Sequence, residues 1–351
     1  MEMKAMVLER AGPAESRPLR AEELEVPAVG RDEVLVRVDA CGVCRTDLHV
    51  VEGELAHPKK RVVPGHEVVG TVAETGGKVA RFVKGDRVGV PWLHSTCGVC
   101  EYCVSGRENL CAKKRYTGYT VDGGYAQFVV GKEAFILSLD ETKRQAREPA
   151  EAISPLLCAG IIGYRAFKLG STKPGGRIAL FGFGGSAHLT LQVAAKMGFE
   201  TVVVSRSSHH LDLAKRLGAS ETHQAESETP RRGRHTGHLP TGKPVDTALV
   251  FAPSGAVVRD ALSSVKPGGT VVVAGIYLDE LPPLDYDKHL FHEKRLLSVE
   301  ANTRDDAHEF LRLSDRLRLK SVVSVRRLSS ANEALLELKR GKVDGALVLK
   351  P

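Results

Sequence analysis

Four cysteines lie within one short segment, residues 97–111, which reads CGVCEYCVSGRENLC. Four thiolates close a tetrahedral zinc shell and leave no position for a substrate. A [4Fe–4S] cluster uses the same ligands, so the spacing C-x2-C-x2-C-x7-C does not exclude it. The segment predicts a structural zinc site that stabilises its own loop, with the ligands Cys97, Cys100, Cys103 and Cys111.

Three further residues suit a metal at which chemistry takes place. Cys44 lies in ACGVCRTDLHVVEG, His66 in PGHEVVG and Cys158 in PLLCAGIIGY. A zinc ion with two cysteines and one histidine keeps one position for water or substrate. Spacing alone leaves the alternative open, because isolated buried cysteines usually just pack and a lone histidine is more often structural.

A glycine-rich segment, GFGGSA, follows the apolar residues RIALF. It fits G-x-G-x-x-G/A, with Gly182 for the tight turn, Gly184 and Gly185 beside the backbone amides, and Ala187 for close packing. Between a predicted strand and a predicted helix, this pattern binds a dinucleotide pyrophosphate at the helix N-terminus. A glycine-rich turn that binds no ligand is the alternative.

The next strand ends without the acidic residue that usually bonds the ribose hydroxyls of NAD. It reads VSRSS, with Ser205 and Arg206 at its end. Arg206 would attract a 2′-phosphate and Ser205 would offer a hydroxyl, so we expect NADP(H). If Arg206 stacks on the adenine or points into solvent instead, NAD(H) is the cofactor.

Two kinds of structure must position these residues. The first part of the chain is β-rich and loop-rich: DEVLVRVDA (32–40) alternates Val34, Val36 and Val38 inward at period two. From about residue 155, apolar strands alternate with helices, which predicts a doubly wound parallel sheet buried on both faces. The strands are expected at 177–181, 201–205, 245–252 and 270–275.

The domain boundaries follow from this change of pattern. Residues 1–155 and 291–351 are assigned to the metal-binding domain, and 156–290 to the cofactor-binding domain. After about residue 290 the regular alternation weakens. The last segment, KVDGALVLKP, fits an edge strand that returns to the first domain.

Length and composition limit the class of protein. A chain of 351 residues is too long for one ordinary core, and 42% hydrophobic with 26% charged residues is typical of soluble globular proteins. The start, MEMKAMVLERAG, has no apolar run of signal-peptide length, and no later stretch approaches a membrane span of roughly 20 residues. We therefore expect a cytoplasmic protein without a membrane partner, in which clustered cysteines bind metal.

The positive charge is too weak to indicate a nucleic-acid partner. The net charge is +7, and the densest basic stretch, PRRGRHTGHLPTGK (230–243), has no aromatic residue for base stacking. A solvated surface loop explains it better. No role is assigned to the wider basic region 221–243.

Several segments together resemble the zinc-dependent medium-chain alcohol dehydrogenases, in particular the bacterial branch akin to cinnamyl-alcohol dehydrogenases. They are CGVCRTDLHVVEG, PGHEVVG, the four-cysteine loop, GGYAQF, and LLCAGIIGYRAFK followed by FGFGGSAH. The motifs occur in the family's order and cover essentially the whole chain. The resemblance implies an α/β protein with a GroES-like catalytic domain, a Rossmann domain, two Zn²⁺ per chain, and a homodimer or homotetramer.

The resemblance also implies how the catalytic zinc is held. Cys44, His66 and Cys158 match its ligands. Glu67 matches an acidic neighbour that approaches the metal when water leaves. Asp47 matches the carboxylate that orients the ligand histidine.

Other matched positions touch the substrate or the cofactor. Thr46 matches the hydroxyl that bonds the substrate alcohol, and His49 the outer end of a proton relay. Arg45 matches a residue beside the cofactor pyrophosphate, and Trp92 a residue that lines the substrate pocket. Cys41 matches no ligand and is interpreted as a packed thiol.

The implied reaction is hydride transfer between a primary alcohol, aliphatic or aromatic, and NAD(P), with NADP(H) favoured. Polyol or sugar dehydrogenases are alternatives. Reductases of activated double bonds are less consistent with the full ligand set, because they usually lack the metal. A non-catalytic, zinc-stabilised protein that binds NADP(H) is the alternative outside enzymes.

Overall fold

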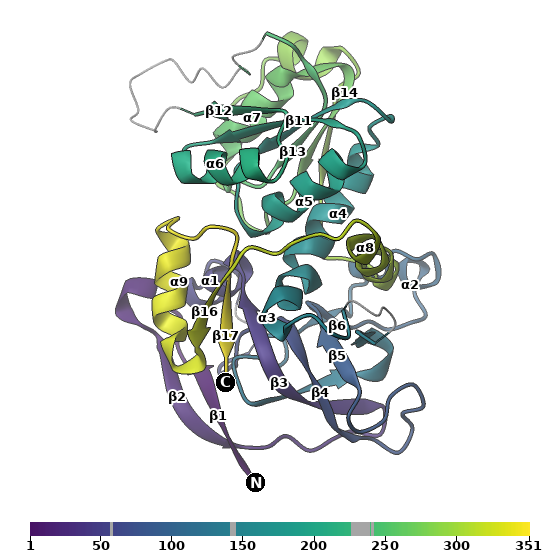
Figure 1. Ribbon diagram of the computed structural model, residues 1–351, viewed down its shortest axis with the longest axis vertical. Helices are drawn as coiled ribbons and strands as arrows, with labels where there is room; N and C mark the ends of the chain where they lie inside the picture. Colours follow the sequence, from purple (N-terminus) through teal and green to yellow (C-terminus); the bar gives the residue numbers. More distant parts are fainter. Residues whose placement is uncertain (57–58, 141–144, 226–238, 240–241) are drawn as a thin grey trace. The chain divides into compact units, whose positions relative to one another are not determined.

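The computed structural model describes residues 1–351 except 57–58, 141–144, 226–238 and 240–241 (Figure 1). The chain divides into two compact units, Met1–Ile161 with Ala301–Pro351, and Ile162–Glu300. The boundaries fall after residues 161 and 300, whereas the sequence indicates 155 and 290. At the second boundary, strand β15 (Arg295–Ser298) pairs with the parallel sheet and keeps residues 291–300 in the second unit. Most of the basic region 221–243 lies outside the described residues.

The first unit is built on a seven-stranded sheet. Its order is β16-β17-β3-β4-β5-β9, and β8 pairs outside this order with the first part of β3, Glu33 to Arg37. The strands are β3 (Glu33–Val43), β4 (Glu67–Thr75), β5 (Arg87–Val90), β8 (Phe128–Lys132), β9 (Leu137–Ser138), β16 (Val323–Arg327) and β17 (Ala346–Lys350).

Shorter elements complete this unit. Two small antiparallel sheets pair β1 (Glu2–Leu8) with β2 (Leu19–Glu25), and β6 (Leu93–Ser95) with β7 (Arg115–Tyr116). The helices are α1 (Arg45–Glu52), α2 (Glu101–Val104), α3 (Ala150–Ile153), α8 (Arg304–Arg316) and α9 (Ala331–Lys339). The 3-10 turns are η1 (Ala14–Ser16), η2 (Glu108–Leu110), η3 (Glu133–Phe135), η4 (Ser154–Leu157) and η6 (Leu328–Ser330).

The valines predicted to point inward in 32–40 belong to the core of this unit. Val34 and Val36 are fully buried and Val38 nearly so, whereas Arg37 between them is exposed. Each buried valine stabilises the fold by about 1.5–3 kcal/mol relative to an exposed one. The core therefore fixes β3, and β3 leads directly into the segment that carries Cys44.

The chain end returns to the first unit as expected, but not as an edge. β17 lies between β16 and β3, parallel to the former and antiparallel to the latter. Its apolar residues Leu347, Val348 and Leu349 are all buried, which suits an inner strand. The irregular pattern after residue 290 also did not predict helices α8 and α9 or strands β15 and β16.

The second unit is a six-stranded parallel sheet in the order β12-β11-β10-β13-β14-β15. Its other strands are β10 (Arg177–Phe181), β11 (Glu200–Ser205), β12 (Glu221–Gln224), β13 (Val245–Val250) and β14 (Val265–Val273). Its helical segments are α4 (Ala159–Gly170), which starts in the first unit, α5 (Gly185–Lys196), α6 (Ser208–Arg216), α7 (Gly255–Ser264) and the π-helical turn η5 (Asp287–Phe291).

The strand order reverses between β10 and β13, as the doubly wound prediction requires. Right-handed crossovers then place α5 and α6 on one face and α7 on the other. Figure 1 shows α5 and α6 in front of the sheet and α7 behind it. One strand begins earlier than the predicted residue 270: β14 starts at Val265 and includes KPGG. Its pairing with β13 has a register shift between Val245 and Thr247.

The expectation that no stretch approaches a membrane span needs a correction. Residues Ala150–Gly170 are long and apolar enough by length and composition, and 61% of the apolar window is buried inside the protein. The stretch consists of α3, η4 and α4 in succession. Such burial is typical of core helices in soluble proteins, so the stretch is weak evidence for a membrane.

Candidate active site

Four side chains from three distant segments meet in the first unit. Cys44 precedes α1, His66 directly precedes β4, Glu67 is the first residue of β4, and Cys158 follows η4. One ligand atom of each lies within 4.8 Å of the others. The structure thus brings together the three metal ligands and the acidic neighbour named from the sequence.

The histidine of this group is prepared to bind a metal. His66 is fully buried, and its Nδ1 lies 2.9 Å from Asp47 Oδ1. A carboxylate only accepts, so Nδ1 carries a proton and Nε2 is the ring nitrogen left to face a metal. Nε2 is buried and has no hydrogen-bond partner among the described residues. A buried acceptor without a partner is costly, and a metal ion at this position would satisfy it.

Asp47 is a fully buried carboxylate that orders the surrounding loops. Besides His66 it accepts hydrogen bonds from Cys44 N at 2.9 Å, Gly65 N at 3.2 Å and the Tyr125 hydroxyl at 3.1 Å. Gly65 has φ +97°, and a Cβ there would lie 2.4 Å from the Tyr125 ring. Tyr125 was missed by the sequence reasoning, since nothing in GGYAQF says which residue its hydroxyl would meet.

The two thiols of the group shift each other's pKa in opposite directions. A hydrogen bond from Cys158 lowers the pKa of Cys44 well below its ordinary value, against the opposing effect of burial. The same bond, together with burial, raises the pKa of Cys158. For His66, burial disfavours the charged form, but Asp47 and Cys44 raise its pKa overall. These effects favour the thiolate form of Cys44, the species that binds zinc.

Glu67 is the fourth member and is 2% exposed. Burial raises its pKa well above the ordinary range, and the Cys44 thiolate acts in the same direction. Its Oε1 accepts a weak hydrogen bond from Ala159 N at 3.4 Å. A Cβ at Gly42 would lie 1.9 Å from Glu67 Oε2, so the carboxyl occupies space that only glycine leaves open.

An aromatic stack lies against the ligand histidine. The Trp92 ring meets His66 edge-on at 4.7 Å between centroids. Tyr116 stacks on the indole at 4.6 Å and 17°, and Tyr119 lies at 5.9 Å and 16°. Trp92 is 4% exposed, so its indole is held rigidly beside the metal ligands. Tyr116 and Tyr119 were not singled out from the sequence.

The other residues named near the site lie on or next to α1. Thr46 and His49 are buried in the same helix, and His49 Nδ1 bonds Glu54 Oε2. Arg45 Nη2 donates to the Leu338 carbonyl at 3.4 Å. Cys41 is fully buried outside the four-residue group and contacts the Gly42 carbonyl at 3.6 Å, which is a packed thiol.

The second cysteine group also comes together. Cys97, Cys100, Cys103 and Cys111 have sulfur atoms within 4.8 Å of one another, and all are reduced. Backbone N–H groups of Cys97 and Lys113 lie 3.5 and 3.4 Å from Cys111 Sγ. Backbone N–H groups of Val99 and Cys100 lower the pKa of Cys97 to about 6. Amide bonds to sulfur stabilise thiolates, so this donor set fits a metal with four sulfur ligands.

The glycine loop of the second unit has the geometry of a phosphate-binding turn. Gly182 has φ +88°, and a Cβ there would lie 2.9 Å from Ala252 N. Gly184 is the N-cap of α5, Gly185 is its first residue, and a Cβ at Gly184 meets nothing within 4 Å. Ala187 is fully buried against the sheet. Open backbone amides at a helix N-terminus favour an anion.

The end of β11 carries hydroxyls and a cation, with no carboxylate in the segment 204–208. Ser205 Oγ accepts from Ser207 N at 3.3 Å and lies 3.5 Å from His210 Nδ1. Arg206 is exposed, and its carbonyl accepts from Gln224 Nε2 at 3.3 Å. The Arg206 guanidinium is thus available at the sheet end where a ribose would lie.

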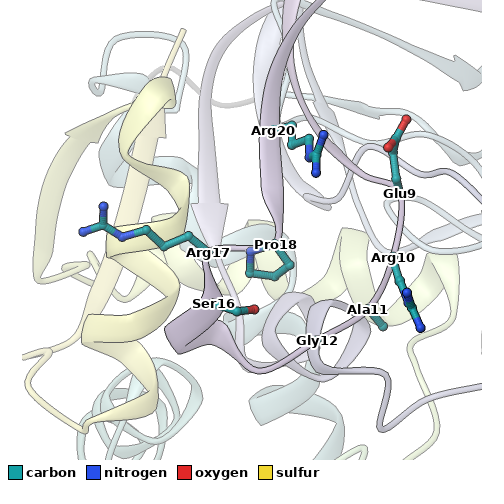
Figure 2. A pocket seen from close by; sticks show the side chains of 8 residues that line it. All are labelled: Glu9, Arg10, Ala11, Gly12, Ser16, Arg17, Pro18 and Arg20. Atoms are coloured by element: carbon teal, nitrogen blue, oxygen red, sulfur yellow. The ribbon is translucent and has the colours of Figure 1, made fainter.

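A cavity of about 260 Å³ lies elsewhere in the first unit (Figure 2). It is lined by Glu9, Arg10, Ala11, Gly12, Ser16, Arg17, Pro18 and Arg20. Figure 2 shows that its three guanidinium groups point in different directions, and Arg17 pairs with Glu333 at 3.4 Å. None of the site residues lines it, so we place the chemistry at the buried group around His66.

A metal site of two cysteines and one histidine, a second site of four cysteines, and a dinucleotide-type sheet define a metal-dependent dehydrogenase. Family models agree with this class. Residues 30–141 match the alcohol dehydrogenase GroES-like domain, and residues 185–316 match the zinc-binding dehydrogenase domain.

Individual relatives agree along the whole chain. A probable alcohol dehydrogenase of Mycobacterium tuberculosis is 43% identical over 99% of this chain and 97% of its own. The structure of the alcohol dehydrogenase of Aeropyrum pernix is 30% identical, with a TM-score of 0.86 over 99% of this chain and 100% of that chain. A cinnamyl alcohol dehydrogenase of Sorghum bicolor is 26% identical, with a TM-score of 0.83 over 100% and 98%. This chain belongs to the zinc-type medium-chain alcohol dehydrogenase family.

Proposed function

We propose that the protein oxidises primary alcohols, aliphatic or aromatic, and reduces the corresponding aldehydes, with NADP(H) preferred over NAD(H). The observation that carries this proposal is the group of Cys44, His66, Glu67 and Cys158, with His66 Nε2 buried and unbonded among the described residues. Zinc in such a site acts as a Lewis acid that lowers the pKa of a bound hydroxyl by many units.

The protein residues around that position have separate tasks. Cys44, His66 and Cys158 hold the metal, and Asp47 keeps His66 in the tautomer that presents Nε2. Thr46 Oγ1 takes up the proton of the substrate hydroxyl as it releases its own, and His49 carries one proton on to solvent. Trp92, supported by Tyr116, narrows the space beside the metal and favours flat or slender substrates.

The cofactor preference rests on the end of β11. No carboxylate stands in 204–208 to repel a 2′-phosphate, and the Arg206 side chain is exposed there. The Arg206→Asp variant should weaken NADP(H) binding far more than NAD(H) binding, because it replaces an attractive charge with a repulsive one. Equal losses for both cofactors would contradict the NADP(H) preference.

We further propose two Zn²⁺ per chain, a cytoplasmic location, and a homodimer or homotetramer. The two separate donor sets support the zinc count. The edge strand β15 and the preceding residues 281–291 expose apolar side chains that a second copy of the chain would cover: Leu281, Tyr286, Phe291 and Leu297. Light scattering should give a dimer or larger, and Leu297→Lys should shift it toward the monomer. A wild-type monomer would contradict this proposal.

The experiment that tests the function is a set of initial rates with the zinc-loaded protein. In one direction, the rates of NADPH and NADH oxidation would be measured with acetaldehyde, benzaldehyde and cinnamaldehyde. In the other direction, a polyol or sugar would be the substrate and the reduction of the oxidised cofactor would be measured. We expect aldehyde reduction with a clear NADPH preference. Preference for polyols would change the substrate class. Two zinc ions with no turnover would favour the non-catalytic NADP(H)-binding protein.

A further inference from the structure

Glu54 lies directly beside the proposed proton carrier His49. Helix α1 ends at Glu52, and Gly53 turns the chain back with φ +77°. The backbone N–H of Glu54 then donates to the His49 carbonyl at 3.0 Å, and its Oε2 bonds His49 Nδ1. The His49 side chain is 6% exposed, whereas that of Glu54 is 33% exposed. The pair therefore reaches from a buried imidazole to the solvent.

This contact determines which ring nitrogen of His49 accepts a proton. A carboxylate only accepts hydrogen bonds, so His49 Nδ1 carries a hydrogen and Nε2 becomes the basic nitrogen of the neutral ring. Asp47 likewise accepts a hydrogen bond from His66 Nδ1, at 2.9 Å, so that Nε2 of His66 faces away from the carboxylate. Two carboxylates thus fix two histidines, one to bind metal and one to move protons.

The other charged groups packed around α1 bond elsewhere, and Glu54 is the carboxylate that bonds His49. The helix packs on α9 and η1, where Glu15 and Lys339 meet, and Glu52 of α1 also bonds Lys339. The remaining carboxylates of α9 face arginines: Glu333 pairs with Arg17, and Glu337 with Arg326. Asp47 bonds His66, and Arg45 donates to a backbone carbonyl.

We propose that Glu54 is a positioning residue of the proton exit: it holds His49 with Nε2 as proton acceptor and stabilises the imidazolium that forms. This inference rests on the proposed alcohol dehydrogenase function. When an alcohol is oxidised, Nε2 gains the one proton released by the substrate hydroxyl, and the imidazolium later gives one proton to water. Glu54 takes up no proton in this step and acts as an orienting carboxylate beside a general base.

Glu54→Gln is the test variant, because it keeps the side-chain shape and removes the charge. The acid limb of the pH profile for alcohol oxidation should move down by about one pH unit, since the carboxylate no longer favours the imidazolium. The plateau rate should fall several-fold, because His49 becomes a weaker base. Glu54→Asp should recover part of the plateau rate. The matched control is Glu52→Gln on the same helix, whose profile should equal that of the wild type.

A second readout does not depend on turnover. Nitrogen-15 NMR of the imidazoles should show His49 as the Nδ1–H tautomer in the wild type and as a mixture in Glu54→Ala, with His49→Asn to assign the signals. If the wild type turns over alcohols but Glu54→Gln leaves both profile and tautomer unchanged, this inference is wrong and the proposed function stands. If the zinc-loaded wild type oxidises no alcohol, the function and the role of Glu54 fall together.

Discussion

The two cysteine-containing groups of the first unit are built in opposite ways. The loop group takes all four ligands from residues 97–111, and three of its cysteines are only half-buried. The group around His66 takes ligands from residues 44, 66 and 158, and places a carboxyl beside them. A set of four sulfurs closes a metal shell, whereas two sulfurs and one nitrogen leave a position open. Local spacing is sufficient for a structural site, but a reactive one needs the whole fold.

The histidines near the two groups show the same contrast. His66 has a buried carboxylate at Nδ1, which raises its pKa despite burial. His94, on β6 just before the loop group, has its Nδ1 beside the Ser95 hydroxyl instead; burial and then the charge of Arg115 lower its pKa to about 4. The negative charge around His66 favours positive charge on or beside its ring, whereas His94 favours the neutral form.

The largest effect is expected when a ligand of the reactive group is removed. Cys44→Ser should lower alcohol oxidation by more than about a hundredfold, because the metal loses a thiolate ligand. Zinc content should fall from two per chain to one, with an unchanged circular dichroism spectrum. The control is Cys41→Ser, a buried thiol nearby that should leave activity within a few-fold. Full activity in Cys44→Ser would exclude this site.

Removing a ligand of the loop group should affect stability rather than turnover. Cys103→Ser should lower the unfolding temperature by about 5 °C or more, because the loop loses its metal. The rate constant at 20 °C should stay within about twofold. Thr96→Ala serves as control, since Thr96 Oγ1 touches Cys103 Sγ at 3.4 Å without being a metal ligand. A loss of turnover before any loss of stability would reverse the assignment of the two groups.

Asp47→Asn should loosen the reactive group without deleting a ligand. The amide has lost the charge that holds His66 Nδ1–H, so zinc affinity should fall about 10–100-fold. Competition with a chromophoric chelator measures this change. Tyr125→Phe removes only one of the hydrogen bonds to Asp47 and should cost about 1 kcal/mol of stability. If Asp47→Asn binds zinc as tightly as the wild type, Asp47 does not orient His66.

An effect that is confined to low pH concerns His94. Its folded pKa of about 4 lies below the unfolded value near 6.5, so the unfolded state binds a proton first as the pH falls. Stability linked to His94 is complete above pH 6.5 and is lost towards pH 4, by about 2 kcal/mol at pH 5. Denaturation followed by the single tryptophan, Trp92, should show a steeper decrease between pH 7 and 5 for wild type than for His94→Gln. Equal slopes would mean that His94 is protonated in the fold.

Much of the fold was predictable because its signals are local. The strand 177–181 and the glycine turn after it follow from apolar runs and one motif, and the observed elements agree closely. The pattern failed where context decides. β17 looked like an edge strand, but pairing with both β16 and β3 places it inside the sheet.

The sequence by itself determined the donor types, the loop group and the dinucleotide turn, because residues a few positions apart are held at short range by the chain. Only the tertiary structure decided that Cys158 meets Cys44 and His66, that Tyr125 bonds Asp47, and that Trp92 lies between His66 and Tyr116. Contacts across tens of residues depend on how strands and loops pack, and no spacing records that packing. Glu54 and His49 are near in sequence, yet their bond depends on the turn at Gly53.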